Sequence, residues 1–110
     1  MTQHHNEVRL VGRLGNGVTA RTLPSGAVLT SFSVVVERSA REVHGRSKVD
    51  TIACQTTRAT VCNRLDKLDQ GQVVEVSGSL RRRFWKSGAG LASATEVDVK
   101  QLCVVRDASR

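Results

Sequence analysis

The densest group of residues able to do chemistry is the hexapeptide 80–85, which reads Leu-Arg-Arg-Arg-Phe-Trp. Alternate side chains of an extended strand share a face, so Arg81, Arg83 and Trp85 are predicted to lie together, opposite Leu80. Guanidinium groups bind phosphates and an indole ring stacks on a base, a combination that suits single-stranded nucleic acid. The alternative is a solvated basic edge that discourages aggregation, with Trp85 packed in an interface.

A second candidate surface lies on the third predicted strand, earlier in the chain. Ile52, Cys54 and Arg58 share a parity there, and the Arg58 guanidinium is able to stack on or pair with a nucleotide. The alternative for this face is cover by a partner subunit. Arg9 and Arg13 share one face of the first predicted strand, and either line the same groove or form a solvated face. Three more cations complete the predicted DNA-binding surface: Arg41, Lys48 and Lys86.

Nothing in the pattern favours an enzyme. The three histidines, His4, His5 and His44, lie in the polar start or in a predicted loop, and none is paired by spacing with a cysteine or carboxylate. The acidic residues form neither an acid–base pair in apolar surroundings nor a metal-ligand cluster. The glycine-rich stretch 12–17 lacks the Lys-Ser/Thr of a phosphate-binding loop, and its glycines suit a β-bulge or bend. We therefore expect no catalysis, no cofactor and no metal.

The chain of 110 residues carries 17 Lys and Arg against 10 Asp and Glu, a formal net charge of +7. This balance favours a polyanionic partner, and nucleic acid is preferred to a membrane because no basic amphipathic helix is visible. No apolar run approaches the length of a membrane span, and residues 1–7 lack the apolar core of a secretory signal. Three widely spaced cysteines without a CxxC pair fit free thiols in a reducing compartment. We expect a cytoplasmic, nucleoid-associated protein.

The elements that position these residues are predicted to be mostly β-strands. Alternating apolar residues predict five strands, over about residues 8–14, 27–38, 49–58, 72–85 and 94–105. On the fourth predicted strand, Val74, Val76, Gly78 and Leu80 share the core side, and on the fifth, Val97, Val99 and Cys103 share one parity. Turn residues at 23–26, a basic stretch at 39–48 and a glycine-rich stretch at 86–90 predict loops.

One short helix interrupts the strands. Ala59, Cys62, Leu65 and Leu68 recur at about three-residue spacing, which predicts a helix of roughly ten residues ending near Gly71. Five strands with one helix between the third and fourth are the order of an OB-fold, a small partly open barrel. We predict a single all-β OB-fold domain over residues 1–110. The alternative fold is an SH3-like barrel.

Three segments resemble the bacterial single-stranded DNA-binding protein (SSB) family. Residues 6–14, Asn-Glu-Val-Arg-Leu-Val-Gly-Arg-Leu, are similar to the family's opening strand. Residues 23–26 followed by 32–34 resemble its first turn and second strand. The run 71–85 resembles its fourth strand most specifically. Together these segments cover about residues 6–105, and the resemblance implies binding of single-stranded DNA without sequence specificity.

The resemblance also implies roles for single residues. Trp85 matches a stacking Trp of the family, and Arg81 and Arg83 match its basic neighbours. Two other stacking positions of the family fall at Ile52 and Arg58, so this chain is expected to depend more on arginine electrostatics, with weaker binding and a steeper salt dependence. The family forms dimers or tetramers, which implies a homo-oligomer. The chain has no acidic tip of the kind that recruits replication and repair proteins, which suggests a divergent, tail-less paralogue.

Three functional hypotheses follow. The leading one is a binder that protects exposed single strands in replication, recombination or repair. The alternative is a primosomal, PriB-like OB-fold assembly factor, which acts mainly through protein contacts and binds DNA weakly. A third is an RNA-binding OB module, which a competition between RNA and DNA distinguishes from the first.

Overall fold

The strands form where apolar residues alternate, and the computed structural model describes residues 2–43 and 45–105. In chain order its elements are β1 (Val8–Leu14), β2 (Thr19–Thr22), β3 (Val28–Glu37), the 3₁₀ helix η1 (Ala40–Glu42), β4 (Val49–Thr56), α1 (Ala59–Asp66), β5 (Val73–Ser87) and β6 (Gly90–Val104). The five predicted strands and the helix are present. The extra strand, β2, reads Thr-Ala-Arg-Thr and is exposed throughout, so it has no apolar alternation to predict it. His44 and residues 106–110 lie outside the described residues.

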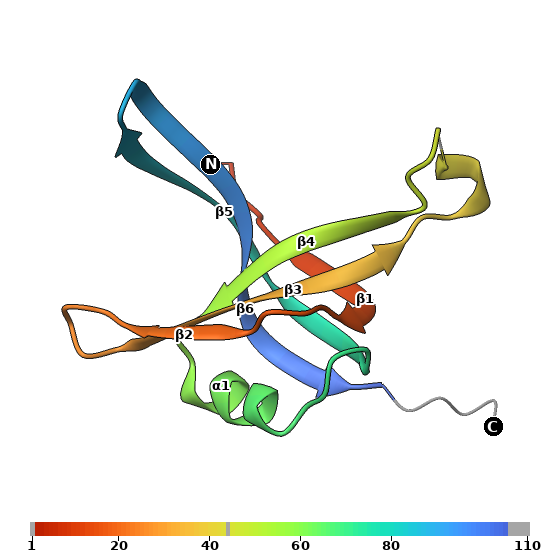
Figure 1. Cartoon of the computed structure of the whole chain (residues 1–110), viewed down its shortest axis with the longest axis horizontal. Coiled ribbons are helices and arrows are strands. Elements are labelled where there is room, and N and C mark those ends of the chain that lie inside the picture. The colour runs from red at the N-terminus through yellow and green to blue at the C-terminus, as the bar shows by residue number, and fades with distance from the viewer. Residues whose placement is uncertain (1, 44, 106–110) are drawn as a thin grey trace.

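The strands form one sheet that closes on itself. Their order is β1-β5-β6-β4-β3-β2, and β1 also pairs with β3 through Arg13–Val35 and Leu14–Val34. Five strands therefore make a ring, with β2 added at the edge of β3. The β4–β6 pair is parallel, whereas the other pairs are antiparallel. The helix α1 lies between β4 and β5 in the chain and covers one end of the ring (Figure 1). This architecture confirms the predicted OB-fold.

The core fills the ring and continues under α1. Its buried members come from all five ring strands and the helix: Leu14, Phe32, Val34, Cys54, Val61, Leu65, Val74, Val76, Val97, Val99 and Leu102. Removing this apolar surface from water is the main force that closes the ring. In the part of the chain that the structure describes, no helix combines the length and apolar character required to cross a membrane.

Two glycines let the strands approach closely. A Cβ at Gly12 would collide with the carbonyl oxygen of Val35, and one at Gly78 would collide with that of Asp98. Both glycines lie within strands, where they permit the sharp bends that a small ring requires. For the predicted bulge or bend at the 12–17 glycines, the structure shows close approach of β3 at Gly12.

A bulge breaks the predicted alternation of the last strand. The ladder between β5 and β6 shifts register next to Gly78, which leaves Lys100 as an extra residue on β6. An extra residue reverses which side chains face the core beyond it. Leu102 is therefore buried and Cys103 is exposed. The prediction that Cys103 shares a face with Val97 and Val99 is wrong.

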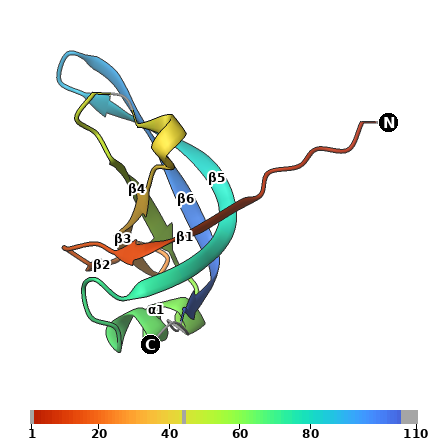
Figure 2. The ribbon, with the colours of Figure 1, turned by 90° about the vertical axis from the view of Figure 1, so that its right-hand side faces the viewer.

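Beyond residue 80, β5 and β6 leave the ring as a projecting hairpin (Figure 1). Pairing continues to Ser87–Gly90, so the turn is only Gly88–Ala89 and the predicted loop 86–90 is shorter than expected. Leu80, predicted to face the core, is exposed because the strand has already left the core at that point. Figure 2 shows this hairpin on one side of the ring, whereas residues 2–7 run away on the other.

Candidate nucleic-acid interface

One face of the projecting hairpin carries the predicted basic and aromatic side chains. Arg81, Arg83 and Trp85 alternate along β5 as predicted, and Trp85 pairs across the hairpin with Ala92. The small neighbour leaves the indole open, and Trp85 is 40% exposed. The guanidinium carbon of Arg83 lies 4.7 Å from the centre of the Trp85 ring, within cation–π distance. The ring and the cation are therefore held together on an open surface.

A buried carboxylate fixes the position of Arg83. The Nε of Arg83 donates a hydrogen bond of 2.8 Å to Oε1 of Glu96 on β6. Glu96 is only 8% exposed, whereas half of the Arg83 side chain remains open to solvent. The carboxylate therefore anchors one edge of the guanidinium and leaves the rest of it available. The sequence places Glu96 on a strand but gives no sign of this pairing.

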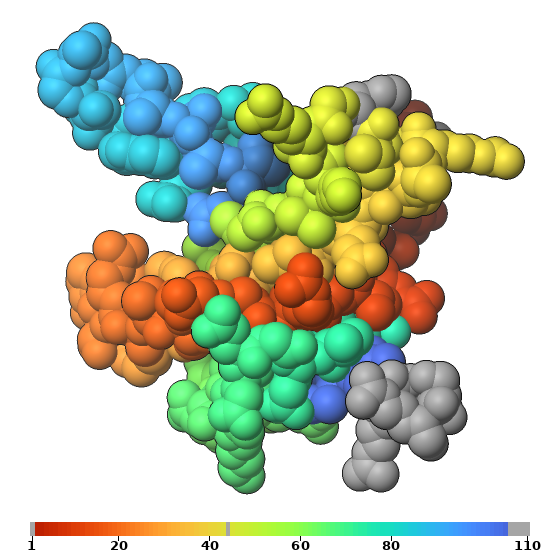
Figure 3. All heavy atoms as spheres, turned by 45° about the vertical axis from the view of Figure 1, so that its right-hand side comes forward, coloured from red at the N-terminus to blue at the C-terminus, as the bar shows by residue number. Residues whose placement is uncertain are grey.

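Arg83 and Glu96 form one wall of a cleft of about 230 Å³. The opposite wall comes from the β2–β3 hairpin, and Gln55 of β4 also lines the cleft. Figure 3 shows the two hairpins projecting on the same side of the molecule with a recess between them. Arg21 contributes a cation to the β2 wall. Sequence reasoning missed Arg21 because β2 itself was not predicted; the only signal is one Arg in the short segment Thr-Ala-Arg-Thr, just before a turn.

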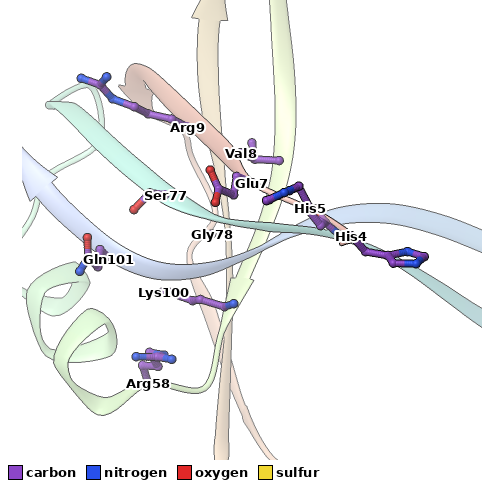
Figure 4. Close-up of a pocket in the computed structure, with 11 residues that line it drawn as sticks. His4, His5, Glu7, Val8, Arg9, Arg58, Ser77, Gly78, Lys100 and Gln101 are labelled. Atoms are coloured by element: carbon purple, nitrogen blue, oxygen red, sulfur yellow. The ribbon is translucent and has the colours of Figure 1, made fainter. Parts of the chain in front are cut away.

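Two predicted residues meet on a different surface. Arg9 and Arg58 line a larger hollow of about 760 Å³, together with Lys100 and both described histidines (Figure 4). Arg9 is engaged there, because its Nη2 lies 3.0 Å from Oε1 of Glu75 and the hydrogen bond and charge of that carboxylate raise the Arg9 pKa. Arg9 thus shares a hollow with Arg58, which is one of the two arrangements that the sequence left open for it. This hollow and the Arg83 cleft have no lining residue in common.

Two residues of the predicted surface on β4 point inward. Cys54 is 1% exposed and belongs to the core, and Ile52 packs against the same cluster. Burial raises the pKa of the Cys54 thiol to about 12, so it stays protonated. The shared parity of the two residues was predicted correctly, but it is the core parity. Neither side chain is available to a ligand on the outer surface, where Gln55 lies instead.

The remaining predicted cations are exposed but dispersed. Arg13 lines a shallow depression between β1 and β3. Lys86 belongs to β5 and alternates with Trp85, so it lies on the opposite face of the hairpin. Neither residue lines the Arg83 cleft.

The connection between β3 and β4 carries Arg41 and Lys48. An ion pair ties its two ends together: Arg38 donates from Nε and Nη2 to the two carboxylate oxygens of Asp50, at 3.0 and 2.7 Å. These hydrogen bonds lower the pKa of Asp50. Arg41 lies in η1 beside this pair, and the Lys48 carbonyl accepts a hydrogen bond from the Arg38 backbone. Within residues 2–43 and 45–105, no three His, Cys, Asp or Glu side chains are grouped to hold a metal ion.

Comparisons with known proteins agree with this architecture. The model of the single-strand binding protein family matches residues 5–105. Single-stranded DNA-binding protein 1 of Staphylococcus aureus and protein A of Bacillus subtilis are each 33% identical over 85 residues, 77% of this chain. The matched region spans about half of those relatives, 51% and 49% of their lengths. Single-stranded DNA-binding protein B of B. subtilis is 30% identical and is matched over 76% of its length.

Solved structures show the same fold. The Plasmodium falciparum SSB in complex with ssDNA superposes with a TM-score of 0.81 at 23% identity, covering 96% of this chain and 99% of that one. A mitochondrial single-stranded DNA binding protein of Saccharomyces cerevisiae superposes with a TM-score of 0.71 at 14% identity, with the same coverage of both chains.

Proposed function

This chain belongs to the single-strand binding protein family, and we propose that it binds single-stranded DNA without sequence specificity. The observation that carries the proposal is the exposed Trp85 ring with the Arg83 guanidinium 4.7 Å from its centre, beside a cleft. An aromatic ring stacks on any base, and a nearby cation attracts any phosphate, so neither group selects a sequence. The names of the S. aureus and B. subtilis relatives support this assignment.

In this mechanism the strand lies between the two hairpins. Trp85 stacks on one base, Arg81 and Arg83 attract the phosphates on that side, and Arg21 attracts them on the other. Glu96 holds Arg83 in place, so less side-chain entropy is lost on binding. Because Trp85 is the only tryptophan of the chain, the electrostatic share of the binding energy is large and binding weakens steeply with salt.

Further phosphate contacts come from the exposed cations away from the cleft. Arg58 and Lys100 face a common hollow, and Arg9 contributes less there because Glu75 already neutralises it. Arg13, Arg41, Lys48 and Lys86 add weaker, long-range attraction. Their spread over the surface suits a strand that wraps around the domain.

The protein acts as a homo-oligomer, a dimer or tetramer, that protects exposed strands during replication, recombination or repair in the cytoplasm. The edge of β1 supports the oligomer: Val8 to Val11 pair with β5 on one side and with no other described strand on the opposite side. An unpaired strand edge readily pairs with another chain. Light scattering on the purified protein measures the number of subunits.

Fluorescence titration tests the proposed function, since Trp85 is the sole tryptophan. Adding oligo-dT at low salt is expected to quench the emission, because the stacked base contacts the indole directly. Repeating the titration at moderate salt is expected to weaken the affinity steeply. Absence of both quenching and binding at low salt would overturn the proposal, and the PriB-like assembly role would then become the better explanation.

A pair of matched variants tests whether the surface around Arg83 binds the DNA. Arg83→Ala is expected to reduce the affinity for oligo-dT several-fold, whereas Lys67→Ala, which removes the same charge at the far end of α1, leaves it nearly unchanged. Competition with duplex DNA and with oligo-rU distinguishes a single-strand DNA binder from a general polyanion binder and from an RNA module. Equal loss of affinity in both variants would show that binding depends on net charge alone.

A further inference from the structure

The projecting hairpin has a second face that the proposed DNA contacts leave unused. Arg82, Phe84 and Lys86 alternate with Arg81, Arg83 and Trp85 along β5, so they point to the opposite side. Across the hairpin their partners are Thr95, Ser93 and Leu91. We call this surface the Phe84 face and the other the Trp85 face.

The Phe84 face repeats the arrangement of the Trp85 face. The guanidinium carbon of Arg82 lies 4.9 Å from the centre of the Phe84 ring, compared with 4.7 Å for Arg83 and Trp85. Arg82 is held by a cross-strand hydrogen bond, since its Nη2 donates to Ser93 Oγ at 3.3 Å. Phe84 is 55% exposed, more than Trp85 at 40%. A phenyl ring kept this open on a polar hairpin contributes nothing to the core.

The charge of the Phe84 face differs from that of the Trp85 face in one respect. Arg83 shares its charge with Glu96, whereas Arg82 and Lys86 make no ion pair among the residues that the structure describes. The cross-strand partners on this face are neutral. The face therefore presents an aromatic ring and two cations without a carboxylate, which complements a polyanion that also has flat bases.

We propose that the Phe84 face is a second nucleobase-stacking site, with Arg82 and Lys86 contacting phosphates, so that the hairpin holds single-stranded nucleic acid on both faces. The proposal rests on the function proposed above and extends it from one stacking site to two. A strand bound on the Trp85 face continues around the tip at Gly88–Ala89 and returns along the Phe84 face. A short oligonucleotide reaches one face, and a long one reaches both.

Moving the single tryptophan to the Phe84 face tests the second stacking site directly. The double variant Phe84→Trp, Trp85→Phe keeps an aromatic ring at each position and transfers the only tryptophan to the Phe84 face. Long oligo-dT is expected to quench its emission in a salt-sensitive way. Quenching of the wild-type protein without any quenching of the double variant would overturn the second site and leave the proposed function standing. Absence of quenching and binding in both proteins would remove both proposals.

A truncation pair separates base stacking from protein docking. Phe84→Ala is expected to weaken binding of long oligo-dT about 5- to 150-fold, the span of stacking one base, while short oligo-dT binds nearly as before. Leu91→Ala removes an aliphatic side chain from the same face that is still more exposed, 72% against 55% for Phe84, and is expected to change the affinity less than about twofold. Unchanged urea midpoints confirm that both variants fold. If Phe84→Ala leaves DNA affinity intact but lowers the number of subunits in light scattering, the face is an interface between copies and the second site is overturned.

Discussion

The two halves of β5 have the same backbone conformation but opposite environments. In residues 73–79, Val74, Val76 and Ser79 are buried, whereas every residue from 80 to 87 is exposed. The first half reads Val-Val-Glu-Val-Ser-Gly-Ser and the second Leu-Arg-Arg-Arg-Phe-Trp-Lys-Ser. The alternation of the first half follows from packing. The second half buries no core, so its arginines and aromatic rings are free to serve contact with a ligand.

The comparison also explains how a hairpin outside the core keeps its shape. Its strands remain paired from Arg81–Glu96 to Ser87–Gly90. Each face adds an arginine over an aromatic ring, and Arg83 adds an ion pair with Glu96. Contacts of this kind stabilise strands by about 0.2–1 kcal/mol each, which is marginal for an isolated hairpin. The anchoring of the hairpin in the ring through residues 73–79 is therefore essential.

The largest expected loss of stability comes from disrupting the segment 73–79 that anchors the hairpin in the ring. Gly78→Ala places a Cβ against the Asp98 carbonyl oxygen, which forces the β5–β6 backbones apart. We expect a loss of about 3 kcal/mol in the free energy of unfolding, the upper end for overpacking, measured by urea denaturation. Gly88→Ala at the tip is the control, because its Cβ would meet no atom within 4 Å. A similar loss in both variants would contradict the role of close approach at Gly78.

One variant in the ring and one in the hairpin are expected to affect stability and DNA affinity in opposite ways. Val76→Ala in the ring is expected to lower the free energy of unfolding by about 2 kcal/mol through lost burial and a cavity, with little change in the affinity for oligo-dT. Trp85→Ala in the hairpin is expected to do the reverse and to reduce the binding free energy by about 1–3 kcal/mol. Denaturation and fluorescence anisotropy with labelled oligo-dT measure the two quantities. A large loss of stability in Trp85→Ala would mean that the indole packs rather than binds.

A smaller effect concerns the carboxylate behind Arg83. Glu96→Gln removes the charge that neutralises Arg83, so we expect tighter binding at low salt. The slope of log K against log salt is expected to steepen by about 0.7 for one added phosphate contact. Asp66→Asn on α1 makes the same charge change away from the cleft and serves as the control. Equal slopes in the two variants would show that the Glu96 charge does not neutralise Arg83 toward DNA.

The smallest expected effect is a pH dependence of folding stability, and it arises outside the two halves of β5. Hydrogen bonds from Arg38 lower the pKa of Asp50 in the folded state, so this pair stabilises the fold above the ordinary aspartate pKa of about 3.9. The contribution disappears as the pH falls through the lower folded-state pKa. Asp50→Asn is therefore expected to be less stable than the wild type at neutral pH and equally stable in strong acid. Thermal unfolding over an acid series measures this convergence, and a constant difference would contradict it.

Much of the fold follows from local pattern. The alternation at 8–14 predicts β1 with the bounds that the structure has, and Gly26 adopts the positive φ expected of the turn at 23–26. The helix was predicted from a three-residue spacing that includes Leu65, which is buried. Its other buried residue, Val61, does not belong to that spacing. For the interface, the shared face of Arg81, Arg83 and Trp85 was predicted because a period of two is a property of the strand itself. The same period of two also predicts that Arg82 and Phe84 share the opposite face of the strand.

The sequence by itself determined the five ring strands, the helix and the hairpin that carries Phe84 and Trp85, because these depend on neighbours in the chain. Only the tertiary structure decided which parity faces inward on β4 and beyond the bulge of β6. Cys54 and Ile52 turned toward the core, and the bulge at Lys100 exposed Cys103, because ring closure fixes each strand against partners distant in sequence. The same closure set Arg21 across the cleft from Arg83 and carried Arg58 to a separate hollow with Arg9. Distances between remote segments are set by packing, and packing depends on the whole chain at once.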